Sequence, residues 1–321
     1  MAACIWLFAG QALAQISGEH YLAGTEGIEA GSLPRPGVYT DSLNWFGDLS
    51  ERNGNIDVVQ NARILSFIDE LRPRWITKQK LLSADYGLEA VIPLGYQDEN
   101  LSQQLILPPF RNPILFGSYT FHYGQSELHD WEVSPLLLGW HWRRFDLTAG
   151  YAVWVPMGDD SAVFGPYPFD PNAYVPPAQY HWWEHIISLG GTWHPDEPHN
   201  WSLSILNHYE ISEPFHSNLG STDPGQLFTT EWGVSRTAGK YAELGLVGNY
   251  AAPVTTSRLS YGPLFLPSIY SSVEIGPEIK INVSKFDFSA SLRYLRELNN
   301  PNGSAGDYDL NIVALTLSKR F

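Results

Sequence analysis

From residue 36 onward, apolar and polar residues alternate with a period of two, which is the spacing of an extended strand. In the last segment, Val313, Leu315 and Leu317 fall on one face, and Thr316 and Ser318 fall on the other. Each such segment is long enough to cross a bilayer as a tilted strand, which takes about 9–11 residues. The pattern predicts twelve strands, near 36–47, 64–78, 82–95, 129–141, 144–156, 181–193, 200–212, 226–237, 240–251, 271–283, 285–297 and 308–321.

The connections between these strands alternate between short and long. The short ones lie near Lys80, Arg143, Asp196, Gly239 and Ser284, and the two longest are 96–128 and 157–180. An even number of strands with this alternation is typical of bacterial outer-membrane barrels, which have short periplasmic turns and long outer loops. The sequence therefore predicts an all-β fold, a transmembrane antiparallel up-and-down β-barrel over residues 36–321. A soluble β-sandwich or lipocalin-like barrel is the alternative.

The composition of the chain fits such a barrel. Of 321 residues, 14% are aromatic and 17% charged, and the net charge is -15. A mean hydropathy of -0.18 argues against a bundle of membrane helices, and a pI near 5.0 argues against nucleic-acid binding. Membrane barrels carry aromatic girdles at both interfaces. Candidates for these girdles are Trp45, Trp75, Trp131, Trp140, Trp154, Trp183, Trp193, Trp201 and Trp232.

The two ends of the chain indicate its destination. Residues 1–14 have the apolar run and the Ala12-Leu13-Ala14 motif of a secretory signal peptide, with a buried strand as the alternative. The terminal Phe321, with apolar residues at alternate positions before it, resembles the signal read by the outer-membrane assembly machinery. We therefore expect a bacterial outer-membrane protein whose partners are outer-membrane lipids and this machinery. Residues 15–35 are expected to form either a periplasmic N-terminal segment or a plug in the lumen.

Charged residues occupy the positions opposite the apolar face of the strands. Because charges are costly on the lipid face, these side chains are expected to line the lumen. The two open interpretations are charges that pair across a closed barrel and charge rings that bias passage through a pore. The candidates are Glu70, Arg72, Arg74, Lys78, Asp85, Glu89, Glu184, Glu231, Glu274, Glu278 and Arg293.

The predicted outer loops offer candidates for a gate, namely Phe110, Phe164, Tyr167 and Phe169. Proline limits the freedom of segment 157–180, which favours a lid or constriction. Asp159, Asp160 and Asp170 have carboxylates of the kind that bind Ca²⁺, but their spacing matches no defined calcium loop. We therefore expect no metal site and no cofactor.

Catalytic motifs are absent from the sequence. Neither His-Glu-x-x-His nor Gly-x-Ser-x-Gly occurs. His208 and Glu210 share one face of a predicted strand, where we expect structural hydrogen bonds rather than acid–base chemistry. The protein is therefore not expected to be an enzyme.

Four stretches of the chain, in this order, resemble the MetA-pathway of phenol degradation family of outer-membrane proteins. They lie in 20–39, 86–94, 134–142 and 149–159, and include Gly24-Thr25-Glu26-Gly27, Ile92-Pro93-Leu94, Gly139-Trp140-His141-Trp142 and Pro156-Met157-Gly158-Asp159. The resemblance implies a barrel that is linked in some members to the catabolism of aromatic compounds, with a role in uptake. It supplies no catalytic or ligand-binding residues.

Together these observations predict a monomeric outer-membrane channel for the passive uptake of small hydrophobic or aromatic solutes. Two alternatives stay open. One is a closed barrel with a structural or surface-interaction role and no transport, and the other, more remote, is an outer-membrane enzyme that modifies lipids.

Overall fold

The fold was analysed in a computed structural model of the chain. The structure describes residues 21–55, 58–107, 114–128, 130–157, 182–197, 199–216, 221–255, 258–261, 264–266, 271–298 and 307–321. Within these residues, no helix has the length and hydropathy needed to span a membrane.

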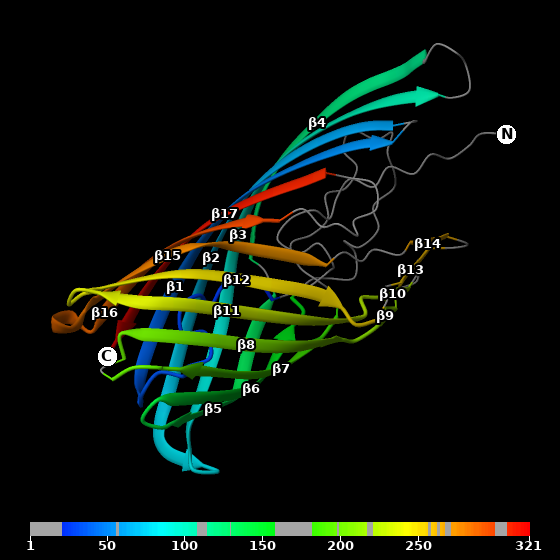
Figure 1. Ribbon diagram of the computed structural model, residues 1–321. Helices are drawn as coiled ribbons and strands as arrows, with labels where there is room; N and C mark the ends of the chain where they lie inside the picture. Colours follow the sequence, from blue (N-terminus) through cyan, green and yellow to red (C-terminus); the bar gives the residue numbers. More distant parts are fainter. Residues whose placement is uncertain are drawn as a thin grey trace.

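Thirteen strands form one antiparallel sheet. β1 pairs with β2 on one side and with the last strand, β17, on the other, so the sheet closes into a barrel (Figure 1). The thirteen strands are β1 (Gly37–Asn55), β2 (Val58–Leu81), β3 (Ala84–Leu107), β4 (Ile114–Leu128), β5 (Trp131–His141), β6 (Phe145–Val155), β7 (Glu184–Trp193), β8 (Trp201–Ser212), β11 (Gln226–Ala238), β12 (Ala242–Pro253), β15 (Ser272–Val283), β16 (Phe288–Glu297) and β17 (Asp307–Arg320).

Four short strands form a separate small sheet, in the order β14 (Leu264–Leu266), β13 (Arg258–Tyr261), β10 (Ser221–Asp223) and β9 (Phe215–His216). A single 3₁₀ turn, η1 (Ser284–Phe286), is the one helical element of the described residues, and it connects β15 to β16.

β4 and β5 share one place in the barrel wall. β3 pairs with β5 over residues 85–91 and with β4 over residues 94–107, so β4 and β5 follow one another along the same edge. The ring therefore has twelve strand positions, and the prediction of a closed twelve-stranded antiparallel barrel is confirmed.

The prediction of a long loop over 96–128 is wrong. This stretch instead continues β3 to Leu107 and returns as β4. β1 and β2 likewise extend past the predicted ends, to Asn55 and back to Val58. The extensions of β1, β2 and β3 have polar residues at both parities of the strand, so they lack the alternation that a strand with one apolar face shows. The sequence of β4, in contrast, alternates from Ser118 to Tyr123.

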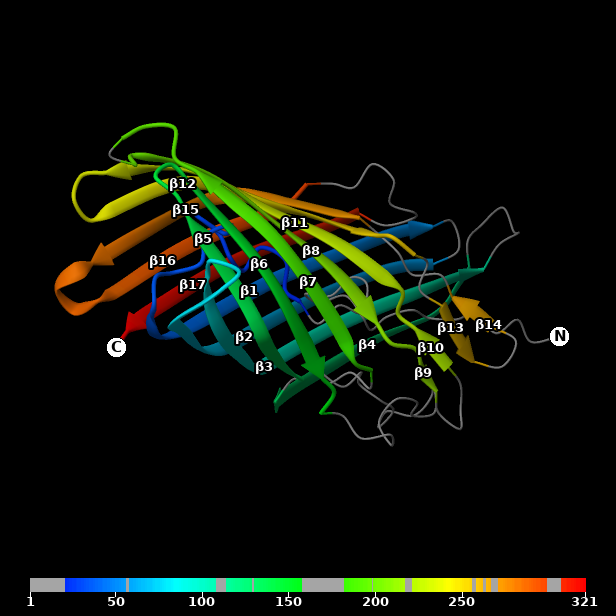
Figure 2. The same ribbon diagram turned by 90° about the horizontal axis from the view of Figure 1, so that it is seen from below.

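The short turns lie at the same end of the barrel as the C-terminus. Figures 1 and 2 both show the β11–β12 and β15–β16 turns at this end. The other turns of this set connect β2 to β3, β5 to β6 and β7 to β8. Because outer-membrane barrels have their short turns on the periplasmic side, we assign this end to the periplasm.

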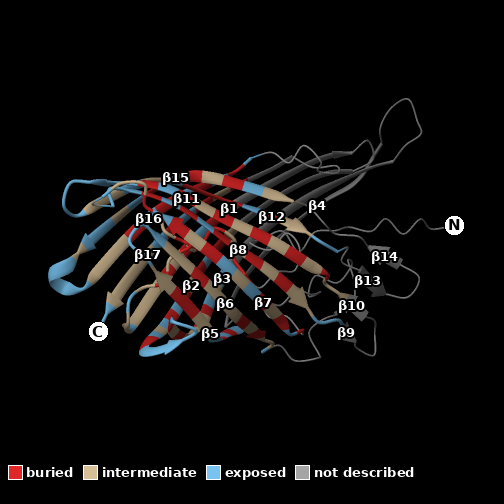
Figure 3. Ribbon diagram, turned by 60° about the horizontal axis from the view of Figure 1, so that its bottom comes forward, coloured by how far each residue is buried: buried red, intermediate tan, exposed pale blue. Residues whose placement is uncertain are grey.

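Exposure alternates along several strands of the barrel, such as β8, β11 and β16 (Figure 3). On β8, Trp201, Leu203 and Ile205 are exposed, whereas Ser202 and Ser204 are buried. An apolar outer face on a closed sheet is the surface that a bilayer requires, because every backbone polar group is then paired within the sheet. Of the predicted girdle residues, those exposed on the outside are Trp75, Trp131, Trp183, Trp193 and Trp201.

Trp45 and Trp154 are not girdle residues. They are only 2% and 3% exposed and point into the barrel. The prediction assumed that every large apolar side chain of a strand faces lipid. Here the interior contains a further chain segment with apolar side chains, and both tryptophans belong to clusters that include it.

Candidate functional site

The predicted lumen charges lie on the inner face of the barrel. They alternate with exposed apolar residues, as Arg72 does with Leu71 and Arg293 with Leu292 and Tyr294. Eight of them are buried residues, namely Glu70, Arg72, Asp85, Glu184, Glu231, Glu274, Glu278 and Arg293. The side chains of Arg74 and Glu89 are also largely covered and form an ion pair with each other.

Lys78 is the exception among the predicted lumen residues, because it is exposed. The pairing of β2 with β3 shifts register between Ile76 and Lys80. A strict two-residue alternation does not carry across such an irregularity, so the inward position of Lys78 stays a prediction.

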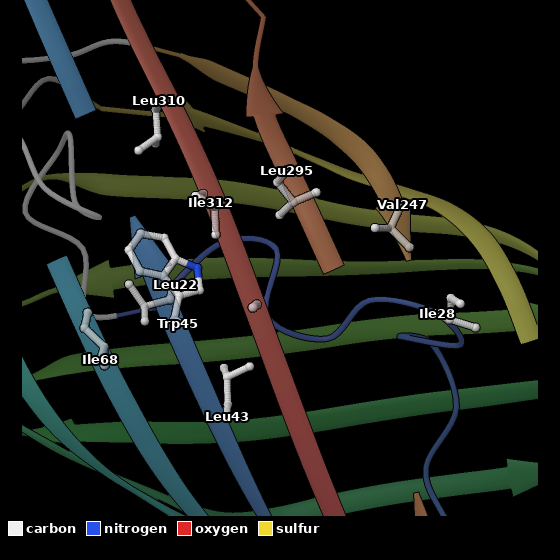
Figure 4. Close-up of a cluster of buried hydrophobic side chains, with 10 residues drawn as sticks. Leu22, Ile28, Leu43, Trp45, Ile68, Val247, Leu295, Leu310 and Ile312 are labelled. Atoms are coloured by element: carbon white, nitrogen blue, oxygen red, sulfur yellow. The ribbon is translucent and has the colours of Figure 1, made fainter. Parts of the chain in front are cut away.

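Residues 21–33 lie inside the barrel and residues 34–36 lead to β1. We call 21–36 the N-terminal segment. Tyr21, Leu22, Ile28, Ala30 and Leu33 of this segment are buried. Figure 4 shows Leu22 and Ile28 on a chain that runs between the strands, close to inward-facing side chains of the wall. The segment therefore fills part of the space that the barrel wall encloses.

Wall side chains bind the backbone of the N-terminal segment. The Glu231 carboxylate accepts hydrogen bonds from Gly24 N at 2.8 Å and Glu26 N at 3.0 Å, and from the Tyr21 hydroxyl at 2.5 Å. Glu278 accepts one from Ile28 N at 3.0 Å. Ser204 Oγ accepts another from Gly31 N at 2.7 Å. These contacts supply the hydrogen bonds that buried N–H groups of an irregular segment need.

Three cations of the wall bind the segment as well. Arg72 forms ion pairs with Glu26 of the segment and Glu70 of the wall, both at 2.7 Å. Arg293 pairs with Glu278 at 3.0 Å and donates a hydrogen bond to the carbonyl of Gly24. Lys280 pairs with Glu29 at 3.3 Å. Charge pairing of this kind stabilises one position of the segment within the lumen.

Glycines let the segment approach the wall closely. A Cβ atom on Gly139 would lie 2.8 Å from Leu33 Cβ, and one on Gly245 would lie 2.9 Å from Ile28 Cδ1. On the segment itself, a Cβ atom on Gly31 would lie 2.4 Å from the backbone of Gly191. Larger residues at these positions would displace the segment. The inner wall is thus shaped to the N-terminal segment as well as bonded to it.

The charge of Glu26 depends on its arginine partners. Burial disfavours the ionised form, but Arg72 and then Arg74 outweigh burial and lower the pKa of Glu26 to about 2. Because this pKa lies below the ordinary value of 4.5, the ion pair contributes its full stabilisation above about pH 4.5. The contribution is lost as the pH falls towards 2.

We therefore expect acid to loosen the N-terminal segment. A nitroxide label on a cysteine at Ala23, in a chain without Cys4, should become more mobile in its electron paramagnetic resonance spectrum as the pH falls from about 4.5 to about 2. In Glu26→Gln, which cannot form the ion pair, the label should already be mobile at pH 7 and should change little on acidification. If acid increases the mobility of the label equally with Glu26 and with Glu26→Gln, the effect comes from another carboxylate.

A small cavity lies between the segment and the wall. Its volume is about 90 Å³, and its lining includes Tyr21, Arg72, Glu89, Ile186 and His208. This is room for roughly three waters at about 30 Å³ each, and less than the ~150 Å³ of a cavity that binds benzene. This cavity is therefore too small for a benzene ring.

His208 presents a polar atom in this region. Its Nδ1 lies 2.8 Å from Ser188 Oγ, and its ring lies 4.3 Å from that of Tyr21. Its buried Nε2 has no hydrogen-bond partner within the described part of the chain. Glu210, its predicted neighbour, accepts a hydrogen bond from Thr229 instead.

Part of the inner wall is apolar, which the charge pattern did not predict. One cluster brings Trp45 and wall residues near it against Leu22 and Ile28 of the segment (Figure 4). Its wall members are Leu43, Trp45, Ile68, Val247, Leu295, Leu310, Ile312 and Ala314. The other cluster combines Tyr21 with Val91, Ala152, Trp154 and Ile186. Large apolar residues at both parities of one strand, such as Trp45 beside Phe46, are the sequence signal of a wall covered on both faces.

Several predicted features lie outside the described residues. They are the signal peptide over 1–14, the gate candidates Phe110, Phe164, Tyr167 and Phe169, and the carboxylates Asp159, Asp160 and Asp170. Among the residues that are described, no group of three or more His, Cys, Asp or Glu is arranged to hold a metal ion.

The fold is similar to that of solved channel structures. The COG4313 outer membrane channel from Pseudomonas putida F1 aligns with a TM-score of 0.61 at 10% identity, over 91% of this chain and 97% of that chain. The toluene transporter TodX of Pseudomonas putida has a TM-score of 0.45 at 12% identity, over 95% of each chain. The first likeness establishes the fold, and the second is too weak to support a conclusion.

Sequence comparison identifies the family. No curated protein matches the chain. The model of the family described as MetA-pathway of phenol degradation matches residues 47–309, which is most of the barrel. The family resemblance predicted from the four short stretches is thereby confirmed, and the chain belongs to the MetA-pathway of phenol degradation family.

Proposed function

We propose that this protein is a channel of the bacterial outer membrane for the passive uptake of small hydrophobic or aromatic solutes, with the N-terminal segment as its plug. The observation that carries the proposal is the apolar inner wall around Trp45 and Trp154 in a closed barrel with an apolar outer face. The family description, which refers to phenol degradation, supports an aromatic solute.

The apolar wall argues against a general pore for polar solutes. Water-filled barrels have polar interiors, whereas sites for hydrophobic ligands are lined mainly by apolar and aromatic side chains. In this barrel, apolar side chains from β1, β2 and β17 gather on one side of the lumen, and others from β3, β6 and β7 gather around Trp154. A hydrophobic solute would replace the segment's side chains on this wall without exposing it to water.

Passage requires the N-terminal segment to shift. The cavity of about 90 Å³ is too small for a benzene ring. The contacts that hold the segment are hydrogen bonds and ion pairs, which water can replace when the segment leaves. Apolar contacts hold it too, and a hydrophobic solute can replace those. The plug is therefore a gate that favours solutes able to cover the apolar wall.

The experiment compares uptake of two solutes by Gram-negative cells that express the protein in a background without comparable channels. Uptake of labelled toluene should rise severalfold over cells with the empty vector, and uptake of labelled arabinose should not. A lipopolysaccharide-containing outer membrane slows hydrophobic solutes, so the barrel's contribution becomes measurable.

Two other outcomes of this experiment would contradict a channel for hydrophobic solutes. Equal gains for both solutes would indicate a general pore. No gain for either, with the protein correctly inserted, would favour the second candidate, a closed barrel with a structural or surface-interaction role. The small cavity and the salt bridges across the lumen are the observations that favour this candidate.

We further infer that the protein acts as a monomer and that the assembly machinery recognises its last strand. Phe321 is exposed at the end of that strand, and Val313 and Leu315 are exposed at alternate positions before it. These features support the C-terminal signal that the sequence predicts.

A further inference from the structure

Basic residues are concentrated at the periplasmic end of the barrel. We define the periplasmic rim as 78–83, 142–144, 194–200, 236–241, 283–287 and 319–321, which are the short turns and the C-terminus. The rim contains nine of the chain's 19 Lys and Arg but only three of its 34 Asp and Glu. The basic residues are Lys78, Lys80, Arg143, Arg144, Arg236, Lys240, Lys285, Lys319 and Arg320, and the acidic ones are Asp196, Glu197 and Asp287. A chain with a net charge of -15 thus has one basic edge.

Some of these cations have carboxylate partners and others do not. Arg143 and Arg144 share Glu197, at 2.6 Å and 3.4 Å. Lys80 pairs with Asp85 of the barrel wall. Among the described residues, no carboxylate lies within salt-bridge distance of the other six cations of the rim. Two of these, Lys319 and Arg320, donate hydrogen bonds to backbone carbonyls. Arg236, Lys240 and Lys285 are exposed and have no such bond. Their charge is available to an external anion.

The rim cations lie over aromatic rings. Arg236 Cζ lies 5.2 Å from the Trp201 ring centroid, and Lys240 Nζ lies 5.0 Å from that of Tyr241. The remaining cation–π pairs are Lys285 with Phe286, Lys319 with Phe321 and Arg320 with Tyr39, at 5.4, 5.8 and 5.9 Å. All five cation–π contacts between described residues are at this end. The rings of Trp201, Tyr241, Phe286 and Phe321 are exposed.

This arrangement fits the boundary between a bilayer and water. Exposed aromatic rings settle at the headgroup level, and long basic side chains beside them extend their charges towards the aqueous side. At that depth the nearest anions are the phosphates of lipid headgroups. Each Lys or Arg near an anionic membrane surface contributes about 1 kcal/mol of attraction.

We propose that the periplasmic rim binds the phosphate headgroups of anionic phospholipids, such as phosphatidylglycerol, in the periplasmic leaflet. Arg236, Lys240 and Lys285 provide the unpaired charges, and the aromatic rings beneath them set the depth of the barrel. Charge complementarity carries this proposal: the acidic chain places nine cations where headgroups lie, and the described residues put no carboxylate within salt-bridge distance of six of them. The proposal does not depend on transport.

The test measures lipid preference at the barrel surface. The full protein is reconstituted in phosphatidylcholine vesicles with trace spin-labelled phosphatidylglycerol or spin-labelled phosphatidylcholine. Electron paramagnetic resonance then gives the relative association constant of the two lipids. We expect about a fivefold preference for phosphatidylglycerol at low salt, as the attraction of one cation would give. Since exposed charges are screened, 0.5 M NaCl should remove most of it.

Two triple variants separate charge from other effects. Arg236→Gln/Lys240→Gln/Lys285→Gln should lose the preference, and the charge-conserving control Arg236→Lys/Lys240→Arg/Lys285→Arg should keep it. Equal association of both lipids with the unmodified protein would overturn the proposal. So would a preference that survives neutralisation or high salt. The salt titration uses the unmodified protein, so it stays decisive even if the neutralised variant fails to insert. The lipid preference and its salt dependence are both measured without solute uptake, so a failure of uptake does not affect them.

Discussion

A disulfide between residue 28 and residue 245 will close the channel, and reduction of that bond will open it. The variant is Ile28→Cys/Gly245→Cys in a chain without Cys4. In the structure, a Cβ atom on Gly245 would lie 2.9 and 3.0 Å from the outer carbons of Ile28, so the two positions face each other. Disulfides need Cβ atoms about 3.5–4.5 Å apart, which is compatible with this contact.

The physical reason is that the cross-link holds the N-terminal segment against β12. The lumen then keeps its cavity of about 90 Å³, which is below the size that accepts a benzene ring. Uptake of labelled toluene by cells with the oxidised variant should therefore fall to the rate of the empty vector. After reduction it should recover to the rate of the unmodified protein.

The matched control places a disulfide elsewhere in the wall. Asn207 and Thr230 are paired across β8 and β11, and their side chains are hydrogen-bonded at 2.9 Å. Neither forms a hydrogen bond to the described residues of the N-terminal segment. Oxidation of Asn207→Cys/Thr230→Cys should leave uptake unchanged. If toluene enters at the same rate while residues 28 and 245 are joined, the segment is not the gate. A deletion of residues 21–33 should give the opposite result, with faster uptake of both toluene and arabinose.

Replacing Arg293 by Met will destabilise the barrel by about 3–5 kcal/mol, the usual cost of removing one partner of a buried ion pair. Arg293 and Glu278 have side chains that are each only 2% exposed, and their charged atoms lie 3.0 Å apart. Without the guanidinium, Glu278 keeps a buried charge, and the carbonyl of Gly24 loses a donor. Water that enters the lumen would bring the cost towards the lower end of this range.

Urea unfolding in lipid vesicles, followed by tryptophan fluorescence, measures this change in the free energy of unfolding. The double variant Arg293→Met/Glu278→Met removes both charges and should recover much of the loss. A double variant as unstable as Arg293→Met would show that the cost comes from lost packing rather than from the unpaired carboxylate.

Much of the barrel was predictable from the sequence, because lipid imposes a rule on every residue that it touches. A strand with lipid on one side must alternate, as β8 does with Trp201, Leu203 and Ile205 outside and Ser202 and Ser204 inside. The inward positions of Arg72 and Glu278 follow from the same rule. The extension of β3 beyond residue 95 lacks this alternation, and the prediction of a loop there is wrong for that reason.

The contents of the lumen depended on tertiary structure. Alternation along a strand says which side chains point inward but not what they meet there. Residues 21–36 have no periodic pattern, and only the closed barrel brings Glu231, Glu278 and Arg72 around their backbone and side chains. The same folding turns Trp45 and Trp154 inward, because the segment supplies apolar side chains for them to cover. Local sequence determined the wall of this protein, and contacts between residues some 200 positions apart decided what fills it.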